Sequence, residues 1–199
     1  MLTRELITSG AYLNQFSRLP DELIWTPERL AHSLHQTIVR RPQGAIWLFA
    51  YGSLIWNPLL RISETRLATL HGWHRSFCLR AIAGRGSTVT LGRMLSLEAQ
   101  GKTRGVALLL DAATLDEELQ VLWSREMLTG AYLPIWVRVR LEDVREIWAI
   151  VFVSNSDHPL YEADARVQTV APLISAASGP LGSNAGYVFL LDRAFRSFR

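Results

Sequence analysis

The sequence IWLFAYGSL, residues 46–54, decides the fold class of this chain more than any other stretch. Its first six residues are uncharged and rich in aromatic side chains, which is typical of a strand buried on both faces. We expect the strand to end at Gly52-Ser53, because glycine permits a sharp turn. Successive N–H groups of such a turn can converge on an anion or a polarised carbonyl oxygen, and Ser53 adds a hydroxyl donor. The spacing matches neither a nucleophile elbow nor a phosphate loop, so a plain turn is the alternative.

Several other segments predict strands around this one. Residues 135–141 alternate apolar side chains with Trp136, Arg138 and Arg140, which indicates a half-buried strand. The remaining strand-like segments, the first three separated by glycine-containing turns, cover residues 75–82, 88–97, 105–110 and 146–153. Strands and a few helices without regular βαβ alternation predict the α+β class, with a small, strongly curved sheet or barrel.

Three helices are expected. One runs from residue 115 to about 127, and Thr114 just before it and Glu117 in its first turn have the spacing of a capping box. A second starts near Tyr161 and is interrupted at Pro172. The third starts at Thr26-Pro27 and carries the apolar stripe of an amphipathic helix. It belongs to residues 1–44, which we expect to form a helical appendage to a domain of residues 45–199.

The composition excludes several classes of protein. The chain has 199 residues, 49% of them apolar, and a formal net charge of +3, which exclude wholesale disorder and give little reason to expect nucleic-acid binding. A single cysteine, Cys78, excludes an internal disulfide and favours a reducing compartment. The uncharged stretches 42–60 and 167–191 contain glycine and proline that a membrane helix would not tolerate. We therefore expect a soluble cytoplasmic protein that binds neither nucleic acid nor membrane.

A carboxylate occupies an unexpected place on the helix of residues 115–127. Leu115, Leu119 and Leu122 lie on one face, and Glu126 continues that face, whereas Arg125 points away from it. Burial of a carboxyl group raises its pKa, and catalysts of proton transfer are tuned in this way. The alternatives are that the helix frays before Glu126 or that Glu126 pairs with an arginine.

The chain resembles the ChaC-type γ-glutamylcyclotransferases. Residues 49–58, FAYGSLIWNP, are similar to the family signature F-G-Y-G-S-L-x-W-x-P, with Ala50 where many relatives have glycine. Further motifs follow in the family's order and cover nearly the whole chain: GWHR at 72–75, GRG at 84–86, GRML at 92–95, GVA at 105–107, LWSREM at 122–127, TGAYLP at 129–134, APLI at 171–174 and SGPLGSN at 178–184.

The resemblance implies a fold and an activity. The fold would be a small mixed β-barrel with flanking helices, the γ-glutamyl cyclotransferase-like fold. The activity would be cleavage of glutathione to 5-oxoproline and cysteinylglycine, without a metal or an organic cofactor. Glu126 matches the family's catalytic glutamate. The loop that holds the γ-glutamyl group would consist of Leu48, Phe49, Ala50, Tyr51, Gly52, Ser53 and Leu54, with Tyr132 and Tyr187 as further substrate contacts.

In this reaction the α-amine of the γ-glutamyl group attacks its own γ-carbonyl. One carboxylate could remove the proton from the amine and return it to the departing nitrogen, which is the role implied for Glu126. The backbone N–H groups of residues 51–54 would hold the α-carboxylate or the developing oxyanion. Two alternatives stay open: a cyclotransferase for other γ-glutamyl amino acids or amines, and a non-catalytic regulatory module linked to cation transport. The sequence does not indicate an oligomeric state.

Overall fold

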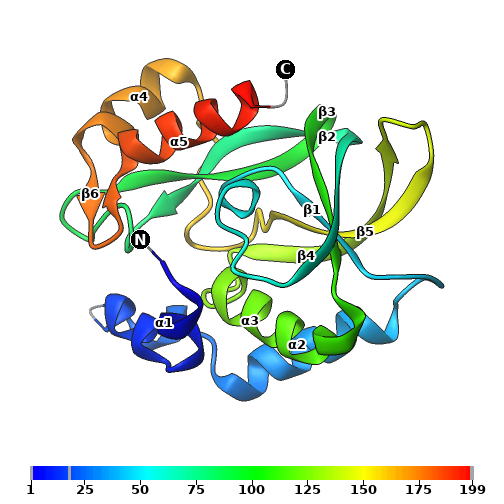
Figure 1. Ribbon diagram of the computed structural model, residues 1–199. Helices are drawn as coiled ribbons and strands as arrows, with labels where there is room; N and C mark the ends of the chain where they lie inside the picture. The colour runs from blue at the N-terminus through cyan, green and yellow to red at the C-terminus, as the bar shows by residue number, and fades with distance from the viewer. Residues whose placement is uncertain (1, 18, 198–199) are drawn as a thin grey trace.

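A computed structural model describes residues 2–17 and 19–197, and its centre is a closed five-stranded barrel (Figure 1). The barrel strands are β1 (Trp47–Ala50), β2 (Ile62–Ala81), β3 (Gly92–Leu110), β4 (Tyr132–Leu141) and β5 (Glu146–Ser154). They pair in the order β1-β3-β2-β4-β5, and the parallel pair β1–β5 closes the otherwise antiparallel barrel. The prediction of an α+β fold with a small mixed barrel is confirmed.

The short strand β1 is buried on both faces, as its uncharged sequence predicts. Phe49 packs with residues of the other strands and with Tyr187 and Leu191 of the C-terminal helix. Leu48 and Ala50 face the opposite way and pack with the helix that contains Leu122. Because both faces contact apolar groups, a charged residue in β1 would lose its hydration, which accounts for the composition of this strand.

The predicted strand boundaries in β2 and β3 are wrong. The segment 75–82 is the end of a 20-residue strand, and the segments 88–97 and 105–110 belong to one 19-residue strand. Gly72 and Gly101 have φ values of +84° and +79° and lie at or beside an irregularity in the β2–β3 register. These glycines therefore accompany a bulge inside the long hairpin, although the sequence pattern predicted a glycine-containing turn between residues 97 and 105.

The helix of Glu126 is α3 (Leu115–Glu126), close to its predicted range, but the predicted capping box is wrong. The chain enters α3 from a 3-10 turn, η4 (Ala112–Thr114). Thr114 has φ −126° and ψ 20°, outside the extended conformation of a typical N-cap, and its side chain makes no capping hydrogen bond among the described residues. Glu117 instead forms an ion pair with Arg4 at 2.6 Å.

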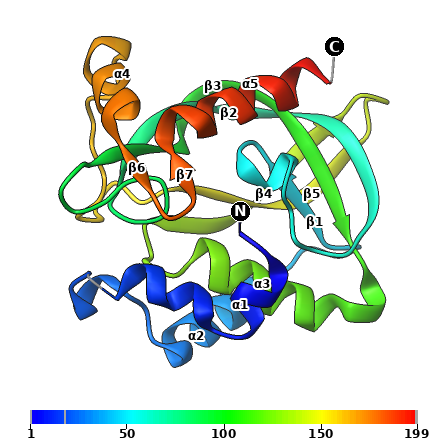
Figure 2. The ribbon, with the colours of Figure 1, turned by 60° about the vertical axis from the view of Figure 1, so that its left-hand side comes forward.

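The C-terminal helices also differ from the prediction. Helix α4 (Val167–Ala176) begins six residues after Tyr161, which forms an isolated β-bridge with Leu79. Pro172 lies inside α4 and does not interrupt it. A small hairpin, β6 (Ser178–Gly179) and β7 (Gly182–Ser183), leads into α5 (Asn184–Arg196), which covers one side of the barrel with α4 (Figure 2).

The N-terminal segment lies beside α3 on the other side of the barrel (Figures 1 and 2). It contains α1 (Arg4–Thr8), the 3-10 helices η1 (Ala11–Phe16) and η2 (Asp21–Leu23), and α2 (Pro27–Val39). The Thr26 hydroxyl accepts a hydrogen bond from the Arg29 N–H, which confirms the predicted start of α2. Within the described residues, no helix combines the length and apolarity needed to cross a bilayer.

A fully buried carboxylate fixes the N-terminal segment to α3. The Glu118 carboxylate lies 2.6 Å from the Arg4 guanidinium and accepts a hydrogen bond from the Arg61 N–H at 3.0 Å. Burial alone would raise the pKa of Glu118, but the hydrogen bonds from Arg4 and Arg61 lower it below its usual value. The ionised pair therefore holds the segment in place at neutral pH.

We expect Arg4→Met to destabilise the protein by roughly 3 kcal/mol at pH 7, because it leaves the Glu118 charge buried and unpaired. The Glu118 pKa is lowered on folding, so the stabilisation exists above its unfolded-state pKa and is lost as the pH falls. The difference in unfolding free energy between wild-type protein and Arg4→Met should therefore become smaller at acid pH. Chemical denaturation at several pH values measures this, with Arg66→Met at an exposed pair as the control. A free-energy difference between wild type and Arg4→Met that is the same at every pH would contradict this prediction.

Candidate active site

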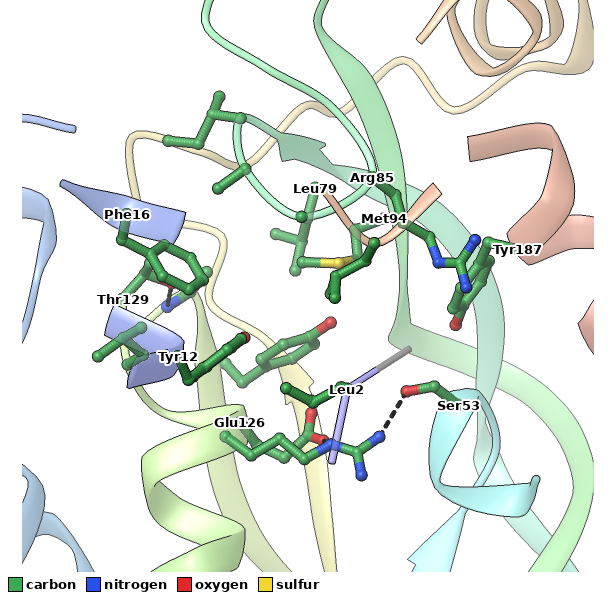
Figure 3. Close-up of a pocket in the computed structure, with 18 of the residues that line it drawn as sticks. Leu2, Tyr12, Phe16, Ser53, Leu79, Arg85, Met94, Glu126, Thr129 and Tyr187 are labelled. Carbon is green, nitrogen blue, oxygen red and sulfur yellow. Dashed lines mark hydrogen bonds and ion pairs between the residues drawn. The ribbon is translucent and has the colours of Figure 1, made fainter. Parts of the chain in front are cut away.

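Glu126 is the last residue of α3, and its side chain is only 15% exposed. Leu119 and Leu122 are buried on the same helix, so the predicted apolar face is confirmed and Glu126 continues it. The carboxylate borders a cavity of about 170 Å³ between the N-terminal segment, the loop after β2 and α5 (Figure 3). The helix does not fray before Glu126.

Arg125 does not point away from the core, so this prediction is wrong. Its side chain is 5% exposed, and its Nε lies 2.8 Å from Oε1 of Glu126. The guanidinium also donates to the carbonyl oxygens of Asn57 and Pro58, and to the Ser53 hydroxyl at 2.9 Å, the dashed line in Figure 3. The loop after β1 packs across the end of α3 and encloses this side chain, which helix periodicity cannot anticipate. The alternative that Glu126 pairs with an arginine is thus realised without removing Glu126 from the cavity.

Burial and the neighbouring arginine act on the Glu126 pKa in opposite directions. Loss of hydration raises the pKa of Glu126, and the charge and hydrogen bond of Arg125 lower it. The net effect is a pKa above the usual value. A carboxylate whose pKa is raised in this way accepts a proton more readily than an exposed one, which suits a proton carrier.

Two tyrosines stand next to Glu126. The Tyr132 hydroxyl donates a hydrogen bond to the Leu95 carbonyl oxygen at 3.0 Å. The Tyr187 hydroxyl lies over Gly52 so closely that a Cβ atom at Gly52 would come within 2.8 Å of it. Burial and the Glu126 charge both raise the pKa of these phenols, so they stay neutral and can serve as hydrogen-bond donors.

A smaller cavity of about 30 Å³ brings most of the predicted site together. It is lined by the four residues of the strand end, by Glu126 and by both tyrosines, with two apolar or aromatic neighbours: Tyr51, Gly52, Ser53, Leu54, Leu95, Glu126, Tyr132, Phe152 and Tyr187. The Tyr51 hydroxyl is engaged by the Phe152 carbonyl oxygen at 2.6 Å. Leu48, Phe49 and Ala50 line neither cavity and lie fully buried in β1. They support the turn from behind.

Sequence reasoning missed several residues that line only the larger cavity. Leu2, Tyr12 and Phe16 come from the N-terminal segment, and Arg85 comes from the loop after β2. Figure 3 shows Tyr12 and Phe16 across the cavity from Arg85 and Tyr187. The GRG motif at 84–86 was a signal for Arg85, but no local pattern marks the N-terminal residues.

The fold and the site together define a class of protein, the small mixed barrels with a largely buried carboxylate beside a glycine-serine turn. A family model described as "ChaC-like protein" matches residues 46–199. The chain belongs to the ChaC-like family, and the resemblance noted in the sequence is confirmed.

Individual relatives agree with this family. A "Glutathione-specific gamma-glutamylcyclotransferase" from Escherichia coli K12 is 49% identical over 97% of this chain and 84% of its own length. A human "Glutathione-specific gamma-glutamylcyclotransferase 1" is 30% identical over 74% of this chain and 68% of its own. The crystal structure of a γ-glutamyl cyclotransferase specific to glutathione from yeast superposes with a TM-score of 0.71 at 21% identity, covering 77% of this chain and 88% of that one. The last comparison shows the shared fold.

Proposed function

We propose that this protein is a glutathione-specific γ-glutamylcyclotransferase that converts glutathione to 5-oxoproline and cysteinylglycine. The observation that carries the proposal is the position of Glu126, a largely buried carboxylate that borders both cavities beside the Gly52-Ser53 turn. The activity named for the E. coli relative, which is similar over nearly the whole chain, supports glutathione as the substrate.

In the proposed mechanism the γ-glutamyl group occupies the smaller cavity, with its scissile amide at Glu126. The α-amino nitrogen attacks the γ-carbonyl carbon and forms the new C–N bond, while Glu126 accepts a proton from that nitrogen. The tetrahedral intermediate collapses, the original amide C–N bond breaks, and Glu126 returns the proton to the cysteinyl nitrogen. Because the attack is intramolecular, a cavity that holds the folded conformer supplies much of the rate acceleration.

The turn after β1 is the proposed anion site of the γ-glutamyl group. Ser53 and Leu54 open the 3-10 helix η3 (Ser53–Ile55), so their N–H groups have no partner within that helix. We propose that these groups bind the substrate α-carboxylate or the developing oxyanion. The Ser53 hydroxyl, engaged by Arg125, would hold the turn in place and would not act as a nucleophile.

Arg85 is proposed to bind the glycine carboxylate at the far end of glutathione. It lines the larger cavity, and its guanidinium carbon lies 5.7 Å from the Tyr187 ring centroid. Its hydrogen bond goes to the Ser183 carbonyl oxygen at 3.0 Å, and it forms no ion pair with a carboxylate among the described residues. A cation with free donors matches a carboxylate ligand. The buried free thiol of Cys78 is compatible with the reducing, cytoplasmic compartment that we propose for the reaction.

The test of the function is an assay of purified protein with glutathione, detecting both 5-oxoproline and cysteinylglycine. We expect equimolar release of the two products. A parallel panel of γ-glutamyl dipeptides and γ-glutamyl amines tests the first alternative, and turnover of these compounds without turnover of glutathione would reject the proposed substrate. Absence of turnover with every compound would favour the non-catalytic alternative.

The raised pKa of Glu126 predicts a pH dependence of the rate. The base must be ionised to accept the amine proton, so kcat/KM should increase as the pH rises through the Glu126 pKa and fall below it. The acid limb should therefore lie above the usual glutamate value of 4.5. A pH–rate profile measures this limb, with thermal stability recorded at each pH to exclude unfolding. A rate that stays level down to about pH 4.5 would show that burial does not raise this pKa.

A further inference from the structure

The N-terminal segment lies outside the region that the ChaC-like family model matches, yet it forms part of the larger cavity. Three of its residues, Leu2, Tyr12 and Phe16, line the cavity, and Figure 3 shows Tyr12 and Phe16 across it from Arg85. We call these three residues the N-terminal wall. The division of the chain at residues 44 and 45 stays a prediction, but the wall belongs to the same cavity as Glu126.

Several contacts fix the N-terminal segment against the loop after β1 and against the residues that follow α3. The Asn57 side chain donates to the Leu2 carbonyl oxygen at 3.1 Å, and the Trp25 N–H donates to the Leu128 carbonyl oxygen at 2.8 Å. The Trp25 ring packs over Gly130, where a Cβ atom would lie 2.3 Å from the ring. With the buried Arg4–Glu118 pair, these contacts give the wall a defined position relative to Glu126.

Tyr12 is the polar residue of the N-terminal wall. Its residue surface is 9% exposed, it packs with Val121 and Leu128, and its ring meets Phe16 edge-on at 5.0 Å. Its hydroxyl makes no hydrogen bond to any residue that the structure describes. Burial and the charge of Glu126 raise the pKa of Tyr12, so the phenol stays protonated. Because Tyr12 lines the larger cavity and its hydroxyl has no partner among the described residues, a ligand in that cavity can accept its hydrogen bond.

The two cavities indicate which part of the substrate Tyr12 faces. Glu126, Ser53, Tyr132 and Tyr187 border both cavities, whereas Tyr12 borders only the larger one. If the scissile amide lies at Glu126 and the γ-glutamyl group fills the smaller cavity, the departing peptide extends into the larger one. That peptide carries a carbonyl oxygen and a carboxylate, both of which accept hydrogen bonds from a phenol.

We propose that Tyr12 is a specificity-determining residue whose hydroxyl donates a hydrogen bond to the cysteinylglycine portion of glutathione. This inference rests on the proposed function of the site. It assigns recognition of the departing peptide to a segment outside the matched family region, while the barrel supplies the γ-glutamyl pocket and the reacting carboxylate.

The test compares Tyr12→Phe with wild-type protein. We expect the KM for glutathione and the inhibition constant of cysteinylglycine to rise about 3- to 10-fold, the effect of losing one hydrogen bond. The inhibition constant of 5-oxoproline should stay unchanged and kcat should change less than about twofold, since the γ-glutamyl pocket is intact. Tyr161→Phe is a matched control, because it removes a hydroxyl that donates to Glu98 and lies outside both cavities.

Other outcomes separate failure of this inference from failure of the proposed function. An unchanged KM and cysteinylglycine inhibition constant in Tyr12→Phe would overturn the role of Tyr12 while leaving the function standing. Equal shifts in the inhibition constants of both products would indicate a general distortion and would also overturn it. Wild-type protein that does not cleave glutathione would overturn the proposed function itself, and this measurement is made first.

Discussion

Glu126→Gln should lower kcat for glutathione by about 10³- to 10⁴-fold. General acid–base catalysis by one side chain contributes about 10²- to 10⁴-fold, and the upper part of this range applies because Glu126 is proposed to act in both proton transfers. The amide keeps the size of the carboxyl group but cannot accept the amine proton. Production of 5-oxoproline by the variant, compared with wild-type protein, measures the effect.

Two further measurements separate catalysis from folding in this variant. Glutathione binding to Glu126→Gln, measured by calorimetry, should be retained, because the γ-glutamyl pocket and Arg85 are unchanged. Glu146→Gln is the matched control, since Glu146 is 53% exposed and lies in a surface pair with Arg138. Turnover of Glu126→Gln within about tenfold of wild type would remove Glu126 from the catalytic role.

Arg125→Met should impair both stability and activity. The substitution leaves Glu126 buried without its cation and removes the donors to Ser53, Asn57 and Pro58, so we expect a loss of about 3–5 kcal/mol in unfolding free energy. Arg125 lowers the pKa of Glu126, and its removal should raise that pKa further. The acid limb of the pH–rate profile should therefore move to higher pH, and the rate at any pH on that limb should fall.

The pH–rate profile distinguishes a positioning role of Arg125 from a purely structural one. Denaturant titration gives the stability loss, and Arg138→Met at an exposed pair should cost less than about 1 kcal/mol. If Arg125→Met lowers stability but leaves the acid limb in place, Arg125 holds the loop after β1 without tuning Glu126.

The arrangement of Arg125 also shows how the site is assembled. One guanidinium connects the carboxylate at the end of α3 with the turn after β1, so the proposed base and the proposed anion site are held by the same group. Preorganised charges and donors of this kind need little rearrangement during a reaction. The N-terminal wall completes the enclosure from the other side.

Local patterns predicted the main elements well. The uncharged run before Gly52 predicted β1, the alternation at 135–141 predicted β4, and the spacing of Leu115, Leu119 and Leu122 placed Glu126 on the buried face of α3. The capping box and the turn predicted between residues 97 and 105 were wrong, because the same residue types also serve in 3-10 entries and in bulges. Short motifs of this kind indicate only a local backbone preference, which tertiary packing can override. In the hairpin, the long β2–β3 pairing overrides the preference for a turn.

The sequence by itself determined that Glu126 lies on an apolar helix face and that a sharp turn follows a buried strand, since both follow from the geometry of single elements. Only the tertiary structure decided that Arg125 is buried against Ser53, 72 residues away, and that Tyr12 borders the cavity of Glu126. Periodicity describes a side chain relative to its own helix or strand. Contacts between distant segments depend on how the elements pack, and the chemistry of this site arises from those contacts.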